Sequence, residues 1–78
     1  MALQALVFLN CDYRLMKDAV KAIDRIKGVI ESHATSGAYE AILKVETGNE
    51  NELKHVIKSV AAVSGVIAIV TSIVVGVR

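Results

Sequence analysis

Hydrophobic and polar positions along the chain follow two patterns, one typical of strands and the other typical of amphipathic helices. Residues 2–11 form a near-continuous apolar run, which predicts a central strand covered on both faces. Apolar side chains recur three and four positions apart over residues 13–27 and over residues 49–63, and this spacing predicts two amphipathic helices. Three further runs have strand length and are either alternating or rich in β-branched residues: 29–35, 39–46 and 66–77.

Short polar residues and glycines mark the ends of the predicted helices. The carboxylate of Asp12 is expected to cap the first helix, and Asn49 or Thr47 is expected to cap the second. Gly28 and Gly65 follow the two helices, and Gly28 suits the left-handed conformation that closes many helices. These signals place a strand directly after each helix.

The two halves of the chain repeat one another. The segment 23–30, Ile-x-x-Ile-x-Gly-Val-Ile, matches the segment 60–67, Val-x-x-Val-x-Gly-Val-Ile. Each half therefore reads strand–helix–strand, and the whole chain reads βαββαβ. Right-handed crossovers fold this order into an α+β, ferredoxin-like domain, with a four-stranded antiparallel sheet and two helices on one face.

The second face of this predicted sheet has no helix to cover it. Both faces of the first and last strands are apolar: Leu6 and Phe8 alternate with Ala5, Val7 and Leu9, and Val66, Val70 and Val74 alternate with Ile67, Ile69 and Ile73. An exposed surface of this kind favours aggregation. We therefore expect two subunits to pack these faces together in an assembly of the dimeric α/β-barrel type.

The composition strengthens that expectation. The chain has 78 residues, of which 54% are hydrophobic, with a single Cys and no Pro. A domain this small, without a disulfide, often completes its core by forming oligomers. The lone cysteine also favours a reducing compartment, and we expect the cytoplasm.

The charge pattern excludes several classes of partner. The net charge is +1 with both signs interspersed, so there is no basic footprint for nucleic acid. The N-terminus lacks the charged region of a secretory signal. The uncharged run 59–77 is long enough to span a membrane, but the repeat divides it into a helix end, a turn and a strand. We expect one domain over residues 1–78, with no membrane contact.

The most promising site is the predicted hairpin turn at residues 36–40. Gly37 is expected to supply the positive φ that such turns often need. A free amino acid is a zwitterion, so Glu40 can anchor its ammonium while the N–H groups of Gly37 and Ala38 bind its carboxylate. Three hydroxyls are predicted to add donors: Ser36, Thr71 and Ser72. Glu40 can equally be a solvated carboxylate at a strand end, and Tyr39 either stacks on a ligand or covers an edge of the sheet.

The other reactive side chains lack the neighbouring groups that catalysis or metal binding requires. Cys11 lies in a buried type of strand, where a free cysteine is usually a small hydrophobic residue. His33 and His55 do not have metal-ligand spacing, and there is no phosphate-binding glycine motif or positioned acid–base pair. The sequence thus predicts no metal, cofactor or catalytic residue. Three functions stay open: a module that senses amino acids, an assembly domain without an effector, and a small dimeric α/β-barrel enzyme with His33 as its candidate residue.

Five segments carry a family resemblance: 5–10 (ALVFLN), 26–29 (IKGV), 35–45 (TSGAYEAILKV), 64–66 (SGV) and 71–74 (TSIV). With them, the chain over about residues 3–76 resembles the effector-binding RAM domain of the Lrp/AsnC family of feast/famine transcription regulators. The glycine–aromatic–acid hairpin followed by an alternating strand is the most recognisable part.

The resemblance implies dimers built by sheet packing, rings of such dimers, and small effectors, typically amino acids, bound between subunits near the hairpin. It carries over ligand-binding roles to five positions: Gly37, Tyr39, Glu40, Thr71 and Ser72. The family usually has Asp at the position of Glu40, and its DNA-binding helix-turn-helix is absent from this chain. The resemblance thus implies a stand-alone domain that regulates transcription indirectly, by assembling with itself or with a full-length regulator, without binding DNA directly.

Overall fold

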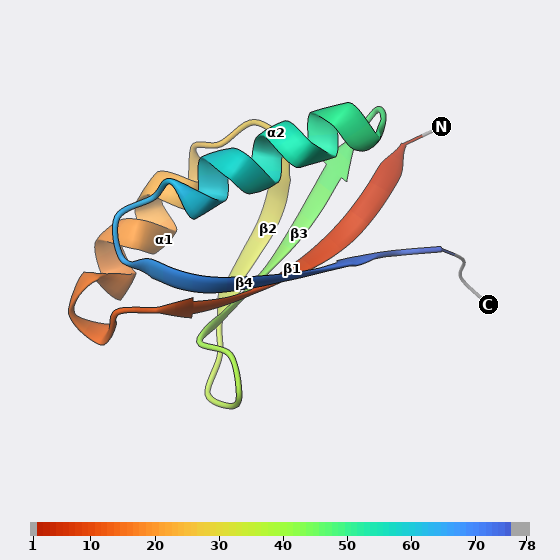
Figure 1. Cartoon of the computed structure of the whole chain (residues 1–78). Coiled ribbons are helices and arrows are strands. Elements are labelled where there is room, and N and C mark those ends of the chain that lie inside the picture. The colour runs from red at the N-terminus through yellow and green to blue at the C-terminus, as the bar shows by residue number, and fades with distance from the viewer. Residues whose placement is uncertain (1, 76–78) are drawn as a thin grey trace.

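The computed structural model describes residues 2–75, which fold into one sheet with two helices packed against it (Figure 1). Four strands form the sheet: β1 (Leu3–Cys11), β2 (Val29–Ala34), β3 (Ala41–Thr47) and β4 (Val66–Ile73). Three helical segments connect them: the 3-10 turn η1 (Tyr13–Leu15), α1 (Met16–Asp24) and α2 (Glu50–Ala61).

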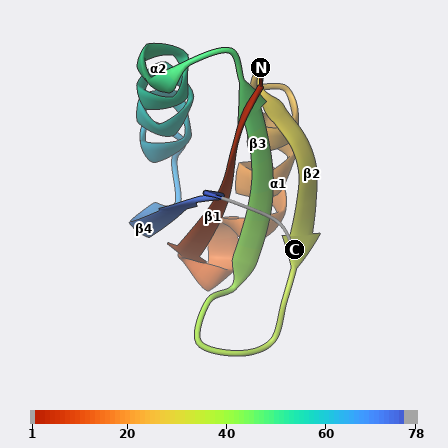
Figure 2. The same ribbon diagram turned by 90° about the vertical axis from the view of Figure 1, so that its right-hand side faces the viewer.

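The strands lie in the order β2-β3-β1-β4, and every neighbouring pair is antiparallel. Figure 2 shows this order, with β2 at one margin of the sheet and β4 at the other. The first and third strands pair at the centre, and each strand–helix–strand half supplies one edge strand. The predicted ferredoxin-like βαββαβ fold is therefore confirmed.

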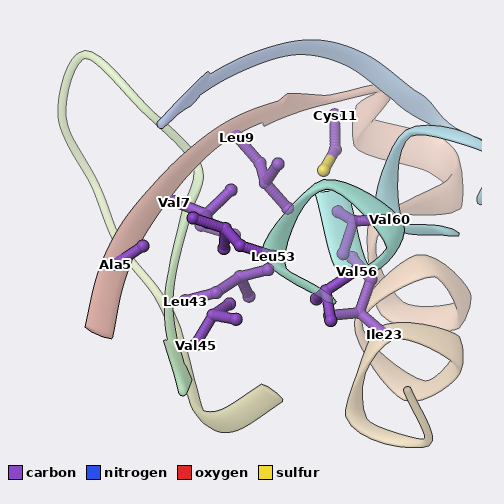
Figure 3. Packing of buried hydrophobic residues seen from close by; sticks show 11 residues of the cluster. Ala5, Val7, Leu9, Cys11, Ile23, Leu43, Val45, Leu53, Val56 and Val60 are labelled. Carbon is purple, nitrogen blue, oxygen red and sulfur yellow. The ribbon is translucent and has the colours of Figure 1, made fainter. Parts of the chain in front are cut away.

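The core lies between the sheet and both helices (Figure 3). On the central strands, alternate side chains face the helices and are completely buried, including Val7 on β1 and Leu43 on β3. Ile23 of α1 and Val60 of α2 pack on them and are equally inaccessible. Burial of a side chain of this size stabilises the fold by about 1.5–3 kcal/mol, so this layer anchors both helices to the sheet.

Asp12 and Asn49 both cap helical segments, although Asp12 caps the 3-10 turn η1 and α1 itself has no side-chain cap. Asp12 Oδ1 accepts a hydrogen bond from Arg14 N at 3.0 Å, and Asn49 Oδ1 accepts one from Glu52 N at 2.9 Å. Asn49, not Thr47, is thus the second cap. The first helix is shorter than its apolar spacing predicts, because it opens as a 3-10 turn and its α-helical part ends at Asp24.

The internal repeat is visible in the backbone. Gly28 and Gly65 have φ values of 105° and 102°, so each takes the left-handed conformation between a helix and a strand. The hydrogen bonds also repeat: Ile26 N and Val63 N donate to carbonyls three residues earlier, at 3.0 and 3.1 Å. The sequence repeat is therefore a repeated turn.

The hairpin differs from its prediction. β2 ends at Ala34 and β3 begins at Ala41, so six residues, 35–40, form an open loop in place of a tight turn. The prediction of a positive φ at Gly37 is wrong, since this conformation occurs only at Gly28 and Gly65 within residues 2–75. A loop of this length reverses the chain gradually and has no need of a left-handed residue.

The predicted face assignment of β4 is also partly wrong. Val66 pairs with Cys11 while Ala68 pairs with Asn10, so the register shifts by one residue at Ile67. Val66 therefore shares the helix-facing side with Ile69, whereas Val70 lies on the opposite side. The strand ends at Ile73, and residues 76 and 77 of the predicted strand lie outside the described residues.

Candidate functional site: the 35–40 loop and the open sheet face

The 35–40 loop projects beyond the end of the sheet (Figure 1). Two hydrogen bonds close its base, because Thr35 N donates to the Glu40 carbonyl at 2.9 Å and Thr35 Oγ1 donates to the Tyr39 carbonyl. The tip residues 36–38 are exposed. Within residues 2–75, the N–H groups of Gly37 and Ala38 donate no hydrogen bond, which leaves them available to an anion.

Glu40 ends the β1–β3 ladder. Its N–H donates to the Leu9 carbonyl at 2.9 Å, and its carboxylate Oε2 accepts from the N–H of Cys11 at 2.5 Å. A carboxylate thus takes the place of the next backbone carbonyl of β3, which satisfies a strand N–H that would otherwise lack a partner. The other oxygen, Oε1, makes no hydrogen bond within residues 2–75 and can accept one from a ligand.

Asn10 is a residue of this region that sequence reasoning missed. It follows Leu9, whose pairing with Ala41 places Asn10 beside Glu40 at the end of the sheet. Its Oδ1 is buried, with no hydrogen-bond partner among the described residues. A polar residue inside an otherwise apolar strand is the signal that could have revealed it, since a buried amide oxygen costs free energy unless a donor reaches it.

The thiol of Cys11 faces the core and is 4% exposed. Burial, and next the negative charge of Glu40, raise the pKa of Cys11 above its usual value. A raised pKa keeps the sulfur protonated and a poor nucleophile at neutral pH. The arrangement fits the interpretation of Cys11 as a small hydrophobic residue.

Tyr39 folds back from the loop onto the sheet. Its ring lies 5.5 Å from that of Phe8, centroid to centroid, with the two planes tilted by 49°. This tilted contact is a favoured aromatic geometry, and it joins the loop to the sheet face that the helices leave uncovered.

That uncovered face, which we call the open face, is apolar at its centre. The strand registers place four apolar side chains there: Leu6, Phe8, Ile42 and Val70. Leu6 is 37% exposed and Val70 is 44% exposed.

Polar pairs border this apolar centre. Gln4 Nε2 donates to Glu46 Oε1 at 3.0 Å, and Lys44 Nζ lies 3.8 Å from Glu31 Oε2. An apolar centre with a polar rim is the usual anatomy of a protein interface.

Thr71 and Ser72 do not join the loop within one subunit. Thr71 pairs with Val7, so its side chain lies on the helix side, whereas Ser72 pairs with Leu6 and lies on the open face. Both are exposed. Their partners on β1, Val7 and Leu6, lie about 10–13 Å along that strand from Asn10, the residue beside Glu40. In addition, β1 separates β4 from β3, the strand that leaves the loop. Only the 36–40 part of the predicted site is contiguous.

The remaining reactive groups stay apart. His33 lies on the open face opposite Ile42, with its Nε2 3.5 Å from Glu31 Oε1, and His55 is exposed on α2. Residues 2–75 contain no group of three or more His, Cys, Asp or Glu side chains placed to hold a metal ion. Nor does any helix in this part of the chain have the length and apolar character to cross a membrane.

Residues 4–77 match the Lrp/AsnC ligand binding domain. The chain belongs to this family. The match covers both strand–helix–strand halves and the loop, so the family resemblance seen in the sequence is confirmed.

Solved structures share the fold of this Lrp/AsnC-type domain. The crystal structure of TTHA0845 from Thermus thermophilus has a TM-score of 0.92 and 19% identity, covering 97% of this chain and 96% of that one. The complex of the transcriptional regulator NMB0573 with L-Met, from Neisseria meningitidis, has a TM-score of 0.85 and 19% identity, covering 95% and 50%. At this identity the likeness shows the fold alone.

A curated relative of the Lrp/AsnC-type domain is an enzyme. The homocitrate synthase of Sulfurisphaera tokodaii is 36% identical over 73 residues, which cover 92% of this chain and 16% of the synthase. The chain therefore corresponds to a small part of that protein.

Proposed function

We propose that this Lrp/AsnC-type domain binds a small effector, an amino acid, at an interface between subunits, and that binding changes its assembly. The observation that carries the proposal is the loop end of the sheet, where unpaired N–H groups and unpaired oxygen acceptors lie on neighbouring residues. The N–H groups of Gly37 and Ala38 suit a carboxylate, and Glu40 Oε1 with Asn10 Oδ1 suits an ammonium.

A neighbouring subunit completes the site in this proposal. Ser36 and Tyr39 border the site from the loop, while Thr71 and Ser72 come from another copy, because within one subunit they lie too far from the loop. The open face supplies the dimer contact, since Leu6, Phe8 and Val70 present apolar surface that a second sheet would cover. Rings of such dimers follow from the family resemblance.

The regulatory consequence is indirect. The chain is proposed to act in the cytoplasm as a single domain over residues 1–78 that does not contact DNA, and to alter transcription by assembling with itself or with a full-length Lrp/AsnC-type regulator. A ligand shifts such an assembly only by its different affinity for the two states. The L-Met bound to NMB0573 makes an amino acid a reasonable first effector to test.

The test is calorimetric titration of the protein with the free amino acids, using Glu40→Gln and Glu40→Ala. Glutamine keeps an oxygen that can accept from the Cys11 N–H but removes the negative charge. It therefore separates the role of Glu40 in ligand binding from its role in the hydrogen bond to Cys11. We expect Glu40→Gln to lower affinity about 10- to 100-fold with little loss of stability. Glu46→Gln, on β3, the strand that follows Glu40, is the matched control and should leave affinity unchanged.

Unchanged affinity in Glu40→Gln would contradict the anchoring role. Absence of binding by every amino acid would favour the assembly-only domain, in which subunit contacts need no effector.

The homocitrate synthase relative favours a second candidate, in which the module controls an enzyme instead of a promoter. In either case the chain is proposed to be a regulator and not itself a catalyst. Adding the purified chain, with and without its effector, to a homocitrate synthase and measuring the reaction rate separates the two candidates. A change in the mass of an amino acid incubated with the chain alone would instead indicate a small enzyme of the dimeric α/β-barrel type.

A further inference from the structure

A pocket of about 430 Å³ lies between the turn that follows α1 and the N-terminal half of α2. Lys27 and Gly28 line it from the turn, and Glu52, His55 and Val56 line it from the helix. Its volume falls within the usual range for sites that bind small molecules.

The pocket is separate from the proposed effector site. Thr47, the last residue of β3, lines the pocket, whereas Glu40 lies just before the first residue of the same strand. The length of β3 therefore places the pocket about 20 Å from Glu40. Figure 1 shows the 35–40 loop at one end of β3 and the beginning of α2 at the other.

Two opposite charges of the pocket have no charged partner within residues 2–75. Neither Lys27 nor Glu52 forms an ion pair, although both line the same pocket. Glu52 Oε2 accepts from Gly48 N at 2.7 Å, whereas its Oε1 accepts no hydrogen bond in this part of the chain. The carboxylate of Glu46 is already engaged, because it accepts from Gln4 Nε2 at 3.0 Å. The available groups therefore suit a ligand that carries an ammonium and a carboxylate.

The rest of the lining includes apolar surface. Ile30 is 50% exposed, and Val56 lies so close to the turn that a Cβ built on Gly28 would be 2.8 Å from its Cγ2. A volume of about 430 Å³ equals that of about fourteen water molecules, at about 30 Å³ each. A single small amino acid such as valine occupies little more than half of this space, whereas a dipeptide of two such residues matches it.

We propose that this pocket binds a zwitterionic dipeptide with apolar side chains. Its ammonium is held by Glu52 Oε1 and its carboxylate by Lys27 Nζ, while its side chains contact Ile30 and Val56. The ring of His55 lies on the helix side of the pocket and can hydrogen-bond to the peptide link of the ligand. The site differs from the effector site in both position and ligand size.

The experiment titrates the whole chain with valylvaline and follows each backbone amide by two-dimensional NMR. Three further ligands dissect the recognition: N-acetylvalylvaline lacks the ammonium, its amide lacks both charges, and free valine lacks the second residue. The amides of Gly28, Gly48 and His55 report on the pocket, and those of Gly37 and Ala38 report on the loop.

Two variants remove the charges of the pocket, Lys27→Gln and Glu52→Gln. The second keeps an oxygen that can accept from the Gly48 N–H, so the turn is preserved. Lys21→Gln on α1 and Glu50→Gln in the first turn of α2 are the matched controls.

We expect valylvaline to shift the amides of the pocket with half-saturation at about 1 mM. Lys27→Gln and Glu52→Gln should each weaken its binding about tenfold, and the two controls should bind as the unmodified chain does. Glu52→Gln should leave the weaker binding of N-acetylvalylvaline unchanged, because that ligand has no ammonium to lose its partner. This difference separates a direct contact from a change in the fold.

Three results would overturn the proposal. The first is a lack of shifts at Gly28, Gly48 and His55 at about 10 mM valylvaline, including shifts confined to the loop. The second is equal binding of the doubly blocked peptide, which would show an apolar contact that does not read charge. The third is equal affinity for free valine, which would assign the pocket to single amino acids.

Discussion

The glycine turns after the two helices and the glycine in the 35–40 loop have opposite surroundings. A Cβ built on Gly28 would lie 2.8 Å from Val56 Cγ2, and one on Gly65 would lie 2.8 Å from Leu15 Cβ. A Cβ on Gly37 would meet nothing within 4 Å. The first two glycines let a helix approach a strand closely, whereas the third leaves a loop tip free, so identical residues serve packing in one region and access in the other.

The largest effect in this comparison is expected for Gly65→Ala. The left-handed φ and the contact with Leu15 both oppose a Cβ, and because the contacting atom is attached directly to the backbone, it cannot rotate away. We expect a loss of about 3 kcal/mol in the free energy of unfolding. Urea denaturation followed by circular dichroism measures it, and a loss below that of Gly28→Ala would reverse the ranking.

Gly28→Ala is expected to cost somewhat less, about 2 kcal/mol, for the same reason of conformation. Its close contact is the Cγ2 methyl of Val56, which can shift by rotation of the side chain. The double variant Gly28→Ala/Val56→Ala removes the contact and keeps the φ penalty. Gly28→Ala should therefore cost less stability in the Val56→Ala background than in the unmodified chain. An equal cost in both backgrounds would show that the contact contributes nothing.

Glu40→Ala tests whether the 35–40 loop also stabilises the fold. Removing the carboxylate leaves the Cys11 N–H without its partner, so we expect a loss of about 1–2 kcal/mol. Glu40→Gln should recover most of it, because its amide oxygen can accept the same bond. Equal destabilisation by the two substitutions would show that the charge, and not the hydrogen bond, matters.

Acidification should weaken the cap at Asp12, whose carboxylate accepts a hydrogen bond from Arg14 N at 3.0 Å. A hydrogen bond from the Arg14 side chain, and next one from the Arg14 N–H, lower the pKa of Asp12 below its usual 3.8. A lowered pKa in the folded state stabilises above the unfolded pKa, and this contribution disappears as the pH falls through the folded pKa. Stability measured from about pH 5 to about pH 2 should therefore decrease less in Asp12→Asn than in the unmodified chain. Parallel curves would contradict this role.

The smallest effect is expected for Gly37→Ala. The open surroundings and ordinary φ leave a Cβ without penalty, so stability should change by less than about 0.5 kcal/mol. Thermal unfolding measures this change, with Gly28→Ala as the contrasting variant. A clear destabilisation would show that the loop tip is packed, as in an assembly of subunits.

Much of this architecture can be predicted from local pattern. The apolar spacing, the repeated glycine turns and the caps Asp12 and Asn49 are local features, because each depends on residues a few positions apart. The hydrogen bond from the Cys11 N–H to Glu40 joins residues 29 positions apart, so no local pattern reveals it. The burial of Asn10 Oδ1 depends on the tertiary packing around it and is equally hidden from the local pattern.

The sequence by itself thus determined the βαββαβ order, the apolar character of both sheet faces and the family to which the chain belongs. Only the tertiary structure decided which residues share a surface. The register shift at Ile67 moves Val66 to the helix side, and strand alternation places Thr71 and Ser72 on opposite faces. The reason is that a strand changes face with every residue, so a single irregularity between paired strands reverses side-chain directions that the sequence pattern alone would assign.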